Sequence, residues 1–171
     1  MKHKILIFEN DCFETLFSTD IEILNKICSE IVVPIFSFED FQYTTNKKII
    51  DAIDECISSK LLTVGDFYHD TEEYQLYKKL TKGKNCVCRG KCESMAISLA
   101  KFKNLTILSN NNLNFCKEFH IQRLSMVDLI TNAYLNNLIT IEEAELIWSK
   151  LIVKSNNYTT FTQFISTKME T

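Results

Sequence analysis

The stretch from residue 90 to residue 129 constrains the fold of this chain most, because its apolar spacing changes twice. Apolar residues first recur at the spacing of an amphipathic helix, namely Cys92, Met95, Ala96, Leu99 and Ala100. A short apolar run over 105–108 is typical of a strand buried on both faces. Ser109 and three asparagines then supply turn and N-cap chemistry. The pattern predicts helix, strand and helix, with polar residues at the carboxyl end of the strand, where open α/β sheets bind ligands.

The rest of the chain repeats this alternation of strands and helices. Strands are expected over 4–8, 31–33 and 121–124, whereas 61–64 fits either a strand or a turn. Further helices are expected over 13–17, 21–30, 36–43, 47–58, 72–80, 113–119 and 125–134, and from 140 onward. Asp20 fits a fresh N-cap, and Thr140 and Glu143 have capping-box spacing. Strands separated by helices predict a three-layer α/β/α fold with a mostly parallel sheet of about four or five strands.

The composition agrees with a single α/β domain and narrows its class. The chain has 171 residues but only three glycines and one proline, which disfavours a loop-rich or all-β design. We expect the domain to span 1–152 and a tail to span 153–171, where Phe161, Phe164 and Ile165 fit a docked final helix.

The charge and the cysteines limit the surroundings and partners. The formal net charge of −3 gives no polybasic surface, so any RNA contact would have to be local. The N-terminal apolar run is too short for a signal peptide, and no run reaches the length of a membrane span. Seven cysteines, an odd number, then suggest reduced thiols in a cytoplasmic protein that does not contact a membrane.

Acidic residues follow two of the expected strands and open a later helix. Glu9 and Asp11 come after the first strand, Glu39 and Asp40 come after the second, and Glu93 lies in the first turn of the helix that begins near residue 91. Each position also has a structural explanation. Glu9 and Asp11 fit caps of the helix that they precede, and acids in a first turn, such as Asp40 and Glu93, are favoured by the helix dipole.

Taken in order, these features resemble the PIN-domain family of metal-dependent ribonucleases, especially its bacterial branch related to toxin nucleases. The resemblance spans roughly residues 4–152, and it includes the Val33-Pro34 step before an acid and the Glu93 helix that ends in Leu99-Ala100. It implies RNA hydrolysis with Mg²⁺ or Mn²⁺. The catalytic positions that it implies are Glu9, Asp11, Asp40, Glu93, Asn110 and Asn111. The metal ligands among these positions are Glu9, Asp11, Glu93 and Asn110.

The chain departs from the family pattern at several positions. Its first acid is Glu9 by spacing or Asp11 by residue type, and Cys92 stands where glycine is usual. Asn110 and Asn111 stand where the family has acids, and an amide offers an oxygen ligand but no negative charge. Two hypotheses follow: a weakened nuclease, or an inert module that binds a protein or nucleic-acid partner, for example in a toxin–antitoxin or defence system. A homodimer is compatible with both.

Two further groups of residues include positions shortly before Glu93. Cys86, Cys88 and Cys92 together with Cys56, His69 or His120 offer ligands for zinc, but their spacing is not the Cys-x₂-Cys of a zinc ribbon and zinc is not the favoured interpretation. Candidate phosphate contacts are Lys84, Arg89 and Lys91, and the alternative for these cations is a solvated loop.

Overall fold

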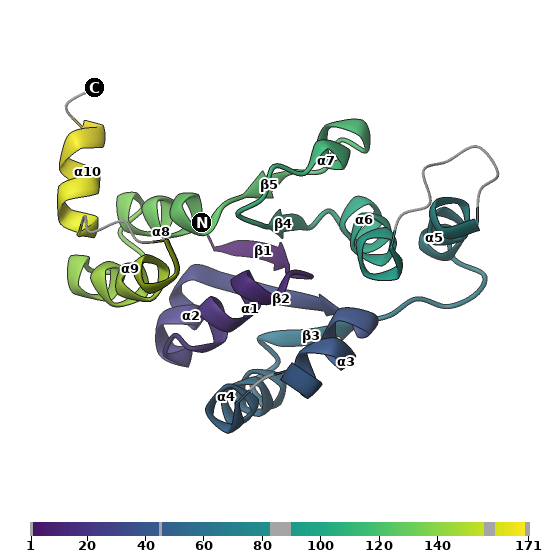
Figure 1. Cartoon of the computed structure of the whole chain (residues 1–171), viewed down its shortest axis with the longest axis horizontal. Coiled ribbons are helices and arrows are strands. Elements are labelled where there is room, and N and C mark those ends of the chain that lie inside the picture. Colours follow the sequence, from purple (N-terminus) through teal and green to yellow (C-terminus); the bar gives the residue numbers. More distant parts are fainter. Residues whose placement is uncertain (1, 45, 83–89, 156–159, 170–171) are drawn as a thin grey trace.

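A five-stranded, entirely parallel sheet forms the centre of the computed structural model, which describes residues 2–44, 46–82, 90–155 and 160–169 (Figure 1). The strand order is β3-β2-β1-β4-β5. The bounds are β1 (His3–Leu6), β2 (Cys28–Pro34), β3 (Leu62–Gly65), β4 (Thr106–Leu108) and β5 (Arg123–Leu124). Because all strands run the same way, their carboxyl ends meet at one edge of the sheet and their amino ends at the other.

Helices cover both faces of the sheet, which confirms the expected three-layer α/β/α fold. The helices are α1 (Asn10–Phe17), α2 (Ile21–Ile27), α3 (Ile35–Thr44), α4 (Lys47–Ser58), α5 (Glu72–Lys82), α6 (Lys91–Lys103), α7 (Asn114–Glu118), α8 (Met126–Leu135), α9 (Ile141–Ser155) and α10 (Phe161–Met169). In Figure 1, α5 and α6 lie at one end of the view and α8, α9 and α10 lie at the other.

Strand residues alternate between two apolar clusters, as strand geometry requires. Ile5 and Ile7 pack in a cluster with residues of α1, α2, α4, α8, α9 and α10. Leu6 and Val32 face the opposite cluster, which is dominated by α6. Gly65 of β3 leaves room for both neighbours, since a Cβ atom added to it would lie 2.8 Å from Val32 Cγ1 of β2 and 2.9 Å from Leu99 Cδ1 of α6. The layers therefore meet on a tightly packed sheet.

The second strand begins earlier than its sequence suggests. The apolar spacing predicts a helix from Ile21 to about residue 30, but α2 ends at Ile27 and β2 starts at Cys28. In the parallel ladder Glu30 lies opposite Lys4, so pairing with β1 decides the conformation of residues whose spacing also suits a helix. The segment 61–64, which fits either a strand or a turn by sequence, contributes residues 62–64 to the edge strand β3.

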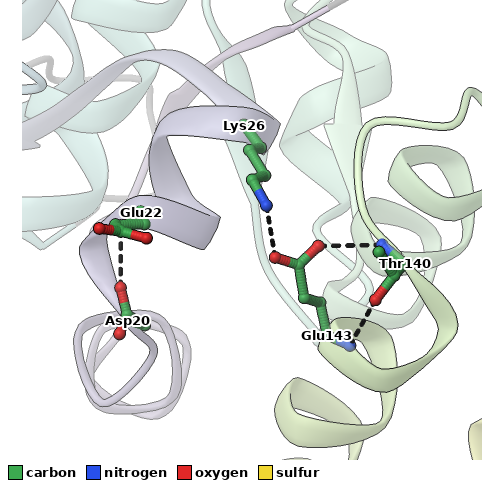
Figure 2. A network of polar contacts seen from close by, with 5 residues as sticks. All are labelled: Asp20, Glu22, Lys26, Thr140 and Glu143. Carbon is green, nitrogen blue, oxygen red and sulfur yellow. Dashed lines mark hydrogen bonds and ion pairs between the residues drawn. The ribbon is translucent and has the colours of Figure 1, made fainter.

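The helix caps predicted at Asp20 and Thr140 are confirmed. The N-cap predicted within Ser109 and the three asparagines is wrong, because the N-cap of α7 is Leu113 and has no side-chain cap hydrogen bond. The Asp20 carboxylate accepts from the Glu22 backbone N–H at 2.8 Å. Figure 2 shows that the Glu143 carboxylate accepts from Thr140 N and from Lys26 Nζ of α2, so the first turn of α9 is tied to a distant helix. The Lys26 ammonium lowers the pKa of Glu143.

The final helix, α10, packs on α9 through aromatic side chains. Phe161 is fully buried, with its ring in edge contact with Trp148 and Tyr134. Glu145 of α9 accepts from the backbone N–H groups of Phe161 and Thr162 at the start of α10. Among the described residues, none of the helices has the length and apolarity to cross a membrane.

Candidate functional site

The carboxyl edge of the sheet brings together residues from both halves of the chain. Glu9 follows β1, and Asn110 and Asn111 follow β4, which pairs with β1. Glu93, in the first turn of α6, lines a cleft of about 330 Å³ with Glu9. Asp40, on α3, lines a neighbouring cleft of about 490 Å³ with Glu93. The six positions that the sequence singled out therefore lie around one edge of the sheet.

The two asparagines donate hydrogen bonds to the acids. Asn111 Nδ2 donates to Glu9 Oε1 at 3.0 Å, and Asn110 Nδ2 donates to Asp11 Oδ2 at 3.3 Å. The side-chain oxygen of Asn110 accepts from the backbone N–H of Met126 at 3.1 Å. Because a backbone N–H can only donate, this contact fixes which way the amide points. The oxygen by which Asn110 could bind a metal is therefore engaged by the first residue of α8.

Arg123 holds the loop that carries these asparagines. Its Nη1 donates to the carbonyl oxygens of Ser109, at 2.8 Å, and Asn111, at 3.2 Å. The buried Ser109 hydroxyl accepts from the Asn111 backbone N–H at 3.0 Å. Sequence reasoning missed Arg123, because a single arginine at the start of a two-residue strand gives no signal. The pairing of β4 with β5 brings it to its partners.

One oxygen of Glu9 lacks a hydrogen-bond partner. Glu9 Oε2 is buried and meets no donor in the part of the chain that the structure describes, although Oε1 accepts from Asn111. A buried carboxylate oxygen without a donor is costly, so this atom is suited to a cation. Ligand atoms of Glu9, Asp11 and Cys12 all lie within 4.8 Å of one another.

The chemistry of this group fits a hard cation only through its oxygens. Burial, followed by the neighbouring Asp11 carboxylate, raises the pKa of Cys12 to about 12, so this thiol stays neutral. Mg²⁺ binds oxygen ligands and often keeps several waters beside one or two carboxylates. Glu9 and Asp11 supply two such carboxylates, and Glu93 lines the same cleft as Glu9.

Asp40 lies beside Cys92. The Cys92 thiol donates to Asp40 Oδ2 over 3.7 Å, and burial raises the pKa of this thiol. Cys86 and Cys88 lie outside the described residues, and so do Lys84 and Arg89. Lys91 is exposed at the start of α6, with its ammonium 6.0 Å from the centre of the Phe36 ring. The zinc and phosphate-contact hypotheses therefore stay predictions.

Taken together, the fold and the edge define an α/β protein whose parallel strands end at acids and amides. No family model matches the chain, and no curated protein matches it. Among solved structures, it is similar to a chain in the crystal structure of VapBC2 from Rickettsia felis bound to a DNA fragment from their promoter. The identity is 20%, the TM-score is 0.46, and the match covers 71% of this chain and 98% of that chain.

Proposed function

We propose that this chain is a divergent PIN-like module of the metal-dependent ribonuclease class, with one divalent cation, Mg²⁺ or Mn²⁺, held at the carboxyl edge of the sheet. The observation that supports it is the buried, unpartnered Oε2 of Glu9, which lies in one group with the Asp11 carboxylate. Glu9 and Asp11 would hold the ion, and Glu93 would approach it across the cleft that it shares with Glu9.

The residues of the edge have separate roles in this proposal. A bound cation would supply the charge that polarises a phosphodiester and activates water. Glu9 and Asp11 provide negative charge, while Asn111 and Asn110 orient one oxygen of each carboxylate. The asparagines lack the charge of the acids that they replace, and a unit-charge pair at about 4 Å and an effective dielectric of about 20 is worth about 4 kcal/mol. We therefore expect weak cation binding and slow RNA cleavage.

The experiment is a calorimetric titration of Mn²⁺ into the wild type and the Glu93→Gln and Glu9→Gln variants, followed by an assay of cleavage on a mixed single-stranded RNA. Binding and cleavage should be present in the wild type and lost in both variants. Glu22→Gln is the matched control, because Glu22 is also a first-turn acid but lies on α2. Cleavage by the Glu93→Gln variant at the wild-type rate would contradict the assignment to the metal-dependent ribonuclease class.

A second function is favoured by the amide contacts. Because Asn110 and Asn111 already donate to Asp11 and Glu9, one oxygen of each carboxylate is satisfied by the protein itself. The chain would then be a non-catalytic module that binds a protein or nucleic-acid partner, as in a toxin–antitoxin or defence system, or a second copy of itself. Absence of Mn²⁺ binding in the wild type, with a normal fold by circular dichroism, would select this alternative.

A further inference from the structure

A cleft of about 510 Å³ opens at the amino end of the sheet, opposite the acidic edge. The starts of β1 and β4, the segment leading into β5 and the last turn of α6 surround it. It is independent of the carboxyl edge, because it shares no lining residue with either cleft beside Glu93.

The cleft is basic although the chain is acidic overall. It is lined by the lysines Lys2, Lys4 and Lys101 and by the histidines His3 and His120, and no carboxylate lines it. Burial lowers the pKa of His3, so the positive charge of the cleft comes from the lysines. Glu30 is paired with the Lys4 ammonium at 3.2 Å, and both of these side chains are partly exposed. The Lys101 ammonium lies 5.7 Å from the centre of the Phe119 ring and has no carboxylate partner among the described residues. Three lysines therefore line the cleft with Glu30 as the one carboxylate among these residues paired with them, which leaves the cleft suited to an anion.

The floor of the cleft differs from its rim. Ala100, Leu105 and Ile121 contribute buried apolar side chains. Asn104 and Gln122 add amide groups beside the cations. Small-molecule sites commonly measure about 300–1,000 Å³ and combine apolar walls with a few polar groups. A ligand that matches this lining has an anionic group and an apolar ring or chain.

We propose that this cleft binds a small organic phosphate of nucleotide size. The phosphate would lie among the ammonium groups of Lys2, Lys4 and Lys101, and the apolar part would rest on the floor near Leu105 and Ile121. Phosphate oxygens accept charge-assisted hydrogen bonds from lysine, while the floor gains from burial of an apolar group. A small ligand fits better than a nucleic-acid strand because the basic residues surround one local hollow, in a chain without a polybasic surface.

The test is calorimetric titration of ADP at low ionic strength with EDTA present, so that no divalent cation links the nucleotide to the acidic edge. Inorganic pyrophosphate and adenosine are titrated separately. The test variant is Lys2→Gln/Lys101→Gln. Lysines near the end of a helix are favoured by the helix dipole whether or not they bind a ligand. The control is therefore Lys103→Gln/Lys117→Gln, which removes the same charge from exposed residues outside the cleft.

ADP should bind the wild type, more weakly as salt is added, and the Lys2→Gln/Lys101→Gln variant should bind about tenfold more weakly. The control variant should stay within about twofold of the wild type. Pyrophosphate should bind more weakly than ADP, and adenosine should not bind. The proposal is overturned if ADP gives no binding, if the control loses as much affinity as the test variant, or if adenosine binds as well as ADP. A single-stranded RNA that binds more tightly than ADP and depends on Lys2 and Lys101 would also overturn it, in favour of a strand.

Discussion

The two ends of the sheet are built from different chemistry. At the carboxyl end, acids and amides are joined by hydrogen bonds between segments far apart in sequence, such as Asn111 to Glu9 and Asn110 to Asp11. At the amino end, cations gather around a cleft and Glu30 is the one carboxylate that the described residues pair with them. The carboxyl end is therefore organised before a ligand binds. At the amino end, a bound anion would neutralise like charges that lie close together.

The largest effect should come from restoring the acids of the family pattern. In the Asn110→Asp/Asn111→Asp variant, two new carboxylates would face Asp11 and Glu9 in place of amide donors. Without metal, the free energy of unfolding should fall by about 3 kcal/mol, since lost hydrogen bonds are replaced by like-charge repulsion. Urea denaturation with and without Mn²⁺ measures this, and Mn²⁺ should recover much of the loss.

Asn25→Asp, at an exposed position of α2, is the control for that experiment and should change stability little. If the double variant were as stable as the wild type without metal, the asparagines would not be the contacts that organise the carboxyl end.

An intermediate effect should separate the two ends directly. Arg123→Gln removes the donor to the Ser109 and Asn111 carbonyl oxygens at the carboxyl end. We expect a loss of about 2 kcal/mol in the free energy of unfolding, because the carbonyl oxygen of the buried Ser109 loses a charged donor. Lys101→Gln removes the same charge at the amino end and should cost less than about 0.5 kcal/mol. Equal losses in the two variants, measured by urea denaturation, would contradict the difference between the ends.

The smallest effect concerns the first turn of α8. The Ser125 hydroxyl donates to Asp128 and accepts from its backbone N–H, and Asn110 accepts from Met126 N. Ser125→Ala should cost about 1 kcal/mol, the usual value of an N-cap, while Asn110 keeps the helix start attached to the edge. Thermal unfolding of Ser125→Ala beside Ser149→Ala, which alters an exposed serine of α9, measures the loss.

The same variant should change the acid limb of stability. The Ser125 hydrogen bond lowers the pKa of Asp128 below its ordinary value of 3.8. A depressed carboxyl pKa stabilises the fold above pH 3.8, and that contribution disappears as the pH falls through the folded-state pKa. The wild type should therefore lose more stability than Ser125→Ala between pH 5 and pH 3. Parallel curves for the two proteins would show that Asp128 does not carry this dependence.

Much of the fold follows from local patterns. Alternation of apolar strands with amphipathic helices predicts a parallel sheet, and a parallel sheet places Glu9 and Asn110 at the same edge. The caps at Asp20 and Thr140 follow from residue type and spacing. Local patterns fail for residues 28–30, where the apolar spacing suits a helix but pairing with β1 produces a strand.

The sequence by itself determined the class of fold and the kinds of residue at the carboxyl edge, because side-chain spacing fixes which faces are buried and strand direction fixes where the loops lie. Only the tertiary structure decided that Asn110 turns its amide N–H groups toward Asp11, that Arg123 holds the Ser109 loop, and that an oxygen of Glu9 is buried without a donor. It also decided that lysines from the two halves of the chain meet in one cleft. Hydrogen-bond direction and charge balance depend on groups brought together by folding, and spacing along the chain does not encode them.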